Sequence, residues 1–276
     1  TLTMKIPTYH MEAGNRSFDA NVPEEINRKV VDHLADFNLV YTEHARRHLI
    51  SEGLSHRFIY VTGSPMLEVL NSKKTQIDTS EVLTKLELKQ NKYFIVSVHR
   101  EENVDNPDSL KKVVNCLNEL HDKYGYPVVV STHPRTKNRL EKLNLVTNSR
   151  DIRFLKPFGF FDYNKLQKEA FCAISDSGTI AEESAMLDFP AVTIRQSIER
   201  PEALDAGSII LTGLNPDILI SAVDLVTKEA DLYPNREVPA EYTVENTSLR
   251  VLKLILGTAK LTNRWRNLES FSRYEW

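Results

Sequence analysis

The chain has 276 residues, of which 41% are hydrophobic and 26% are charged, which is typical of a folded globular protein. Its 35 Lys and Arg residues against 38 Asp and Glu residues give a net charge of -3, so no basic excess predicts a nucleic-acid or membrane-surface partner. No apolar run approaches the roughly 18 residues of a membrane span. Residues 1–7 also lack the pattern of a signal peptide, so we expect a cytoplasmic protein.

The length and the two cysteines give two further expectations. A chain of this size exceeds what one hydrophobic core usually supports, so we expect two lobes. Cys116 and Cys172 each lie in an apolar periodic run. They are interpreted as buried thiols in a reducing compartment, and no metal site is expected.

Helical periodicity is clearest in three segments. A helix is expected to begin at Pro23, and a second one is expected after Thr42, which can cap it, with Gly53 beyond its end. The third follows Asn106 as its N-cap and stops at Gly125. Its buried stripe is expected to contain Leu110, Val113, Val114, Leu117 and Leu120. The buried side of the first helix is expected to contain Ile26, Val30, Leu34 and Phe37.

Short β-branched or aromatic runs alternate with these helical segments. The expected strands are residues 58–61, 93–98, 128–131, 152–155, 171–174 and 191–194. Most of them are continuously apolar, as in strands that helices cover on both faces. The alternation predicts parallel sheets in an α/β protein.

The polar stretch 71–91 marks the expected boundary between the lobes. Residues 93–213 have the pattern of one complete doubly wound domain, whereas the first seventy residues hold too few strands to close a sheet. The chain is therefore expected to begin in the middle of a domain.

Polar clusters follow four of these expected strands and a further expected strand at residues 8–9. In open parallel sheets, ligands bind outside the carboxyl ends of the strands. The clusters lie at residues 10–16, 99–103, 133–135, 176–179 and 199–202. Such a distribution predicts one shared cleft.

The small-residue turn DSGT at residues 176–179 opens an expected helix. A helix N-terminus offers free N–H donors and a positive dipole end, which suits a diphosphate. Glu183, one turn further on, can accept hydrogen bonds from ribose hydroxyls, and Arg200 can supply a fixed cation. The alternative is an ordinary N-cap in which Ser177 or Thr179 satisfies backbone donors.

Two histidine-arginine pairs follow strands. His99 and Arg100 come directly after a strand, where a histidine can act as acid or base or bind a phosphate. The alternative is a histidine bonded to a carbonyl group. His133 and Arg135 occupy the same position after the next strand, which favours an anionic ligand.

Glu12 and Glu24 are the candidate carboxylates for proton transfer. Glu12 lies in a glycine-containing turn after a strand, where no helix end explains it. Glu24 lies in a first helical turn, and local signals alone favour a partner of the helix dipole there.

These motifs together resemble the non-hydrolysing UDP-N-acetylglucosamine 2-epimerase family. The matching segments, in order, are HMEAGNR (10–16), PEEINR (23–28), TGSP (62–65), HREEN (99–103), HPR (133–135), DSGT (176–179) with EE (182–183), and ERPEA (199–203). The resemblance covers the first residues to about residue 213 and extends more loosely to residue 256. It implies an α/β fold of two Rossmann-like lobes of the glycosyltransferase-B kind, the first incomplete, with the UDP-sugar in the cleft between them.

The resemblance also implies a reaction without a cofactor or metal. UDP is eliminated across C1 and C2 to give a 2-acetamido-glycal, and it then adds back with the opposite configuration at C2. Such chemistry needs a base, an acid on the opposite face, and cations for the leaving group. The resemblance implies that Glu12, Glu24 and His99 are catalytic, which reverses the local interpretation of Glu24. The residues predicted to bind UDP are Arg16, Arg100, His133, Arg135, Ser177, Gly178, Thr179, Glu183 and Arg200.

Family members begin with further βα units to which no residues here correspond. We therefore expect residues 1–71 to be the C-terminal part of the first lobe and residues 72–250 to be the UDP-binding lobe. Residues 251–276 are expected to form a helical tail that crosses back to the first lobe. The resemblance also implies a possible homodimer.

Several sequence details point to one branch of the family. Asn15, Gly178 with Thr179, and FGFFDY (158–163) resemble members that convert UDP-2-acetamido-2,6-dideoxy-L-talose to UDP-N-acetyl-L-fucosamine. Conversion of UDP-N-acetylglucosamine to UDP-N-acetylmannosamine is the close alternative. Both reactions supply bacterial surface polysaccharides. The competing functions are a UDP-sugar-binding module inactive through N-terminal truncation, a hydrolysing epimerase and a glycosyltransferase of the glycosyltransferase-B type.

Overall fold

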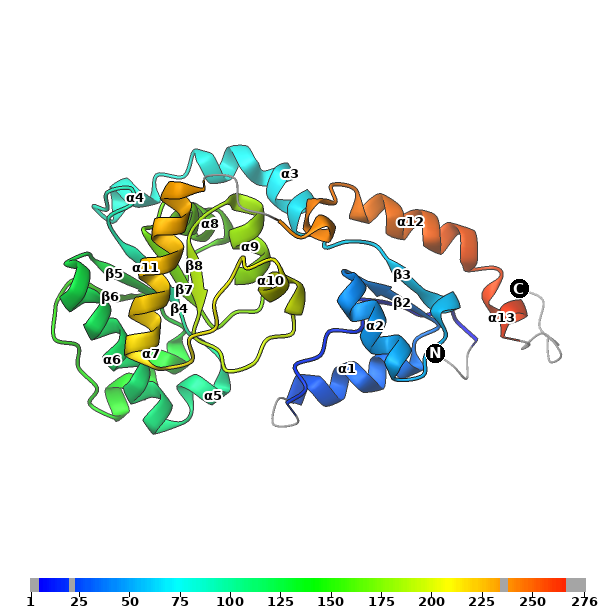
Figure 1. Ribbon diagram of the computed structural model, residues 1–276, viewed down its shortest axis with the longest axis horizontal. Coiled ribbons are helices and arrows are strands. Elements are labelled where there is room, and N and C mark those ends of the chain that lie inside the picture. Colours follow the sequence, from blue (N-terminus) through cyan, green and yellow to red (C-terminus); the bar gives the residue numbers. More distant parts are fainter. Residues whose placement is uncertain (1–4, 20–22, 234–237, 267–276) are drawn as a thin grey trace. The chain divides into compact units, whose positions relative to one another are not determined.

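The computed structural model describes residues 5–19, 23–233 and 238–266, which divide into two compact units (Figure 1). Unit 1 comprises residues 1–69, 199–202 and 240–276, and unit 2 comprises residues 70–198 and 203–239. The domain boundaries expected from the sequence stay predictions. Among the described helices, none combines the length and the apolar character that a membrane crossing needs.

Unit 2 is built on a five-stranded parallel sheet with the order β6-β5-β4-β7-β8. The strands are β4 (Phe94–Ser97), β5 (Val128–Ser131), β6 (Ile152–Leu155), β7 (Cys172–Ser175) and β8 (Ala191–Thr193). Its helices are α4 (Val82–Lys85), α5 (Glu101–Val104), α6 (Pro107–Tyr124), α7 (Pro134–Lys142), α8 (Phe160–Lys168), α9 (Ile180–Leu187) and α11 (Pro216–Leu232). The expected doubly wound domain is confirmed.

Both faces of this sheet are covered, which explains why its strands are continuously apolar. Phe94 and Val96 pack with residues of α6 and α11, which lie side by side in Figure 1. Ile95, between them in sequence, packs with residues of α8 and α9 on the other face. Cys116 and Cys172 are buried free thiols, as expected.

The ends of α6 are those predicted. The Asn106 side chain accepts hydrogen bonds from the backbone N–H groups of Asp108 and Ser109. Gly125 adopts a left-handed conformation with φ of 64°, which a residue without a side chain takes at little cost.

Unit 1 contains a three-stranded parallel sheet with the order β1-β2-β3. The strands are β1 (Tyr9–Met11), β2 (Phe37–Val40) and β3 (Ile59–Val61). Its helices are α1 (Pro23–Leu34), α2 (Glu43–Ser51), η2 (His56–Phe58), η3 (Ala240–Thr243), α12 (Thr247–Thr258) and α13 (Thr262–Trp265). Helices α3 (Met66–Asp78) and α10 (Pro201–Asp205) each have residues in both units.

The buried face predicted for α1 is wrong. Ile26, Val30 and Leu34 are 58%, 52% and 52% exposed. Phe37 lies in β2, where it is fully buried and stacks on Tyr9 with ring centroids 4.8 Å apart. Spacing identified the apolar stripe correctly, but the helix instead turns a polar face to the rest of unit 1.

Candidate active site

The site predicted in unit 2 lies where the order of the strands in the sheet reverses. From β4 the chain moves outward through β5 to β6, whereas from β7 it moves to β8 on the other side. Because β4 and β7 are hydrogen-bonded neighbours, with Ser97 opposite Ser175, they form a topological switch point. Ligands of open α/β sheets bind at the carboxyl ends of the strands at such a point.

A buried carboxylate, Asp176, organises the residues that follow these two strands. It is 0% exposed and accepts hydrogen bonds from the backbone N–H groups of His99 at 3.1 Å and Arg100 at 3.0 Å. The Asn103 amide donates to the same carboxylate at 3.0 Å. The His99 Nδ1 atom lies 3.0 Å from Asp176 Oδ1. The loop after β4 is thus fixed by the first residue after β7.

The two partners shift each other's ionisation. The hydrogen bond to Asp176 is the main cause of a raised His99 pKa. Burial works against the charge of Asp176, but the hydrogen bonds from His99 and Asn103 outweigh it, so the pKa of Asp176 is lowered. With Nδ1 engaged by the carboxylate, the imidazole Nε2 remains as the atom that can face a ligand.

The turn at residues 177–179 is compact and lies at the start of α9. The Ser177 backbone N–H donates to Ser175 Oγ at 3.0 Å, and the Ser177 and Thr179 hydroxyls are 3.0 Å apart. Ser177, Gly178 and Thr179 are all partly exposed. The Thr179 N–H donates to Ser177 Oγ at 3.4 Å, but Thr179, the N-cap residue of α9, makes no capping hydrogen bond with its side chain, so an ordinary side-chain N-cap does not describe this turn.

Glu183 lies one turn into α9 and is 8% exposed. The Gln167 amide of α8 donates to its carboxylate at 2.7 Å, which fixes the side chain. Tyr163, also on α8, has a raised pKa because of its burial and the nearby charge of Glu183. Gln167 and Tyr163 were not among the residues predicted for the site.

The second histidine-arginine pair lies at the start of α7. His133 is its N-cap, and its Nδ1 accepts from the Arg135 N–H at 3.3 Å. The Arg135 guanidinium is ion-paired with Asp105 and, at 3.1 Å, with Glu101. Both side chains are exposed, but the charge of Arg135 already has carboxylate partners.

The predicted residues of unit 1 gather around the turn after β1. Glu12 adopts a left-handed conformation with φ of 63°, and its Oε1 accepts from the Asn15 amide at 3.1 Å. The Arg200 guanidinium lies 3.2 Å from the same oxygen. Arg200 is itself 5% exposed. The structure thus places the candidate proton-transferring carboxylate, whose side chain is 42% exposed, beside a buried cation.

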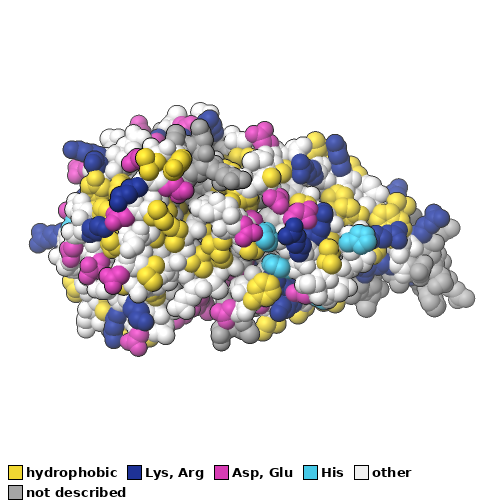
Figure 2. Space-filling view, in the orientation of Figure 1, with side chains coloured by type: hydrophobic (Ala, Val, Ile, Leu, Met, Phe, Trp, Pro, Cys, Tyr) yellow, Lys and Arg dark blue, Asp and Glu magenta, His cyan; other side chains and the backbone are white. Residues whose placement is uncertain are grey.

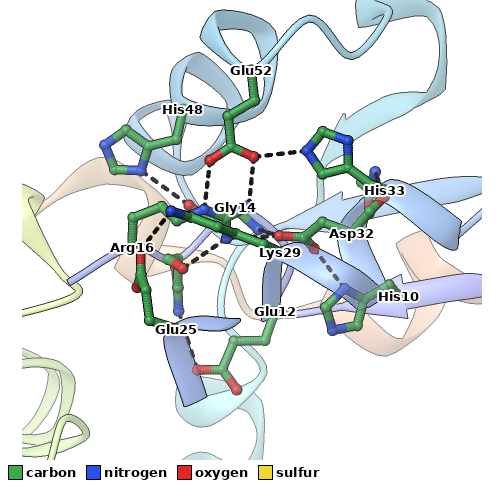
Figure 3. A network of polar contacts seen from close by, with 12 residues as sticks. His10, Glu12, Gly14, Arg16, Glu25, Lys29, Asp32, His33, His48 and Glu52 are labelled. Carbon is green, nitrogen blue, oxygen red and sulfur yellow. Dashed lines mark hydrogen bonds and ion pairs between the residues drawn. The ribbon is translucent and has the colours of Figure 1, made fainter. Parts of the chain in front are cut away.

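Arg16 and Glu24 differ in their surroundings. Arg16 is 0% exposed, and its guanidinium contacts Asp32 and Glu52 (Figure 3). Glu24 is exposed, whereas its neighbour Glu25 is buried and accepts a hydrogen bond from the Ser17 N–H at 2.8 Å. The roles predicted for all these residues stay predictions.

On the face shown in Figure 2, side chains of both charges are interspersed. No large single-sign area that would suit a nucleic acid or an anionic membrane is visible on that face. A small anionic ligand held by a few fixed groups fits this distribution better.

Comparison with known proteins gives a consistent result. Residues 1–256 match the family described as UDP-N-acetylglucosamine 2-epimerase. The chain is 35% identical to the UDP-N-acetylglucosamine 2-epimerase of Methanocaldococcus jannaschii over 84% of its own length, and it spans 65% of that relative.

Solved structures show the same similarity. A UDP-N-acetylglucosamine 2-epimerase from Rickettsia bellii is 42% identical with a TM-score of 0.87, covering 95% of this chain and 70% of that one. The M. jannaschii enzyme in complex with UDP-GlcNAc and UDP is 33% identical with a TM-score of 0.84, covering 92% and 70%. The glycosyltransferase-B-like α/β fold with parallel sheets is therefore confirmed.

Proposed function

Because the chain belongs to the UDP-N-acetylglucosamine 2-epimerase family, we propose that it epimerises a UDP-N-acetylhexosamine at C2. The observation that carries this proposal is the pairing of His99 with buried Asp176 at the switch point, beside the turn at residues 177–179. That the related M. jannaschii enzyme binds UDP-GlcNAc and UDP supports a UDP-sugar as the ligand.

In the proposed binding mode, the diphosphate lies at the start of α9. The Ser177 and Thr179 hydroxyls and the Gly178 N–H are proposed to donate to it, and the protonated His99 contributes a positive charge through Nε2. Glu183, held by Gln167, accepts from the ribose hydroxyls. Arg100, His133 and Arg135 are proposed to complete the cationic surroundings in unit 2, and Arg200 of unit 1 stays a predicted UDP-binding residue.

In the proposed reaction, a carboxylate removes the C2 proton while the bond between C1 and the UDP oxygen breaks. The electron pair of the C2–H bond becomes the C1–C2 double bond, and UDP leaves with the electrons of the C1–O bond. A second carboxylic acid then protonates C2 from the opposite face as UDP adds back to C1, so atoms and electrons balance. Glu12 and Glu24 are the two groups proposed for these proton transfers.

The proposed substrate is UDP-2-acetamido-2,6-dideoxy-L-talose, with UDP-N-acetyl-L-fucosamine as product and bacterial surface polysaccharide as destination. UDP-N-acetylglucosamine is the second candidate. The relatives described above are UDP-N-acetylglucosamine 2-epimerases, which favours the second candidate, whereas the FGFFDY segment at residues 158–163 favours the first.

The test is product analysis by NMR with each sugar nucleotide in turn, with calorimetry of UDP binding alongside. We expect a C2 epimer with one of the two substrates and no requirement for an acceptor. Glu12→Gln should lower turnover by roughly 100-fold or more, the usual contribution of a general acid or base. Glu119→Gln, which changes an exposed glutamate of α6, is the matched control and should leave turnover unchanged.

Three other outcomes would replace the proposal. Binding of UDP without any epimer would identify a UDP-binding module. Release of free sugar would identify a hydrolysing enzyme, and transfer of the sugar to an acceptor would identify a glycosyltransferase.

A further inference from the structure

The face of α1 that points inward carries charged side chains. Glu25 and Asp32, which are two turns apart on the helix, are 2% and 0% exposed. Burying ionised groups is costly unless they are paired and hydrogen-bonded. The turn at residues 12–17 supplies those partners. The inward-facing acids of α1 therefore hold this turn in place.

The Asp32 carboxylate ties together residues on both sides of Glu12 (Figure 3). Its Oδ1 lies 2.7 Å from Nδ1 of His10, the middle residue of β1. Its Oδ2 accepts from the Gly14 backbone N–H at 3.2 Å and lies 2.7 Å from Arg16 Nη1. One buried carboxylate therefore fixes the chain before and after Glu12.

Arg16 is held equally firmly inside unit 1. Its Nε and Nη2 donate to the two oxygens of Glu52 at 2.7 and 2.8 Å, and its Nη1 donates to the Asn15 carbonyl at 2.9 Å. Burial opposes its charge, but the bonds to Glu52 and Asp32 outweigh that effect and raise its pKa. A guanidinium with these partners stabilises the conformation of the turn at residues 12–17.

Glu12 occupies a backbone conformation that needs such support. Its φ of 63° lies in the left-handed region, which is unfavourable for a residue other than glycine. Gly14 is held from the other side by His48, whose Nδ1 lies 3.0 Å from the Gly14 carbonyl oxygen. A side chain at Gly14 would place its Cβ 2.4 Å from the carbonyl oxygen of Ala45, so the turn has little room to shift.

We propose that Asp32, acting through Gly14 and Arg16, is a positioning residue that holds the Glu12 carboxylate beside Arg200. This inference rests on the proposed function, because it assumes that the Glu12 carboxylate transfers a proton. It also gives Arg16 a positioning role in place of the predicted contact with UDP. The alternative is that the cluster only stabilises unit 1.

The test compares Asp32→Asn with Asp36→Asn. Asp36 is a matched control because it is 6% exposed and accepts from the Thr8 N–H at 2.7 Å, at the opposite end of β1. Both variants should melt at a lower temperature. Only Asp32→Asn should lower kcat, by roughly 10- to 100-fold, because a small misplacement of a catalytic group lowers the rate by up to about that factor. The KM of this variant should stay within about 2-fold of the wild-type value.

Similar kcat values for the two variants, or a wild-type kcat for Asp32→Asn, would overturn the inference. Amide hydrogen exchange at Gly14 gives a readout that does not depend on turnover. It should accelerate by at least about 10-fold in Asp32→Asn and stay unchanged in Asp36→Asn. Unchanged protection in Asp32→Asn overturns the inference, whereas a wild-type chain without turnover argues against the proposed function alone.

Discussion

Asp176→Asn is the substitution that most directly probes the switch point of unit 2. An asparagine keeps one oxygen, which can still accept from the N–H of Arg100 and from Asn103 in the place of Oδ2. Its NH2 group then faces His99 Nδ1 where the carboxylate oxygen now lies, 3.0 Å away. The charge-assisted hydrogen bond to His99 is therefore lost without a change of side-chain size.

The magnitude follows from that single bond. A hydrogen bond to a charged group contributes about 1.5–3 kcal/mol. The His99 side chain is 51% exposed, so water screens the interaction and the lower end, about 1.5 kcal/mol, applies. The pKa of His99 should therefore fall in Asp176→Asn, because the protonated imidazole loses that stabilisation.

The sign of the pH dependence is fixed by the two shifts. The raised pKa of His99 gives a stabilisation that is complete below its unfolded value of about 6.5 and is lost as pH rises through the folded value. The lowered pKa of Asp176 gives a stabilisation that is complete above about 3.9 and is lost as pH falls through the folded value. The pair thus contributes most between about pH 4 and pH 6.5.

NMR titration of the His99 imidazole in the wild type and in Asp176→Asn measures the shift. Calorimetry should show that UDP binds the wild type more tightly at pH 6 than at pH 8, and that the midpoint of this dependence lies at a lower pH in the variant. An unchanged His99 pKa in Asp176→Asn would refute the reasoning, because the carboxylate would then not control the imidazole.

Two further predictions concern unit 1. Gly14→Ala should destabilise the protein by roughly 2 kcal/mol or more in chemical denaturation, because its Cβ meets Ala45 and its φ is +78°. Gly53→Ala has a similar φ of +88° but nothing within 4 Å, so it should cost only about 1 kcal/mol, and equal losses would contradict the steric argument. The hydrogen bond from Arg16 lowers the pKa of Glu52 to about 2, so its stabilisation is present above the ordinary value and is lost as pH falls toward 2. Acid unfolding of Glu52→Gln should therefore depend less steeply on pH in that range, and an unchanged slope would contradict the pairing.

The sequence predicted unit 2 well because its signals are local. The apolar strands, the Asn106 cap and the stop at Gly125 are each readable from a few neighbouring residues, and all are present. The rule that ligands bind at the ends of strands also predicts a site at His99 and residues 176–179 from the sequence alone. The structure adds that these two segments follow hydrogen-bonded neighbouring strands.

Unit 1 was predicted less well because its contacts are distant in sequence. The strand at residues 37–40 follows α1 so closely that Phe37 was assigned to the helix. The bonds of Arg16 to Asp32 and Glu52 join residues 16 and 36 positions apart, and no local pattern indicates them. One available signal was the spacing of Glu25 and Asp32, which places two acids on one face of α1.

The most direct test of the proposed epimerisation is solvent exchange at C2. The chain is incubated in D2O with each of the two candidate UDP-sugars, and the recovered sugar nucleotides are examined by NMR. The proposed mechanism predicts one deuterium at C2 of the product epimer, and its loss in Glu12→Gln. Epimerisation that keeps the original C2 proton, or no exchange with either substrate in a folded sample, would contradict it.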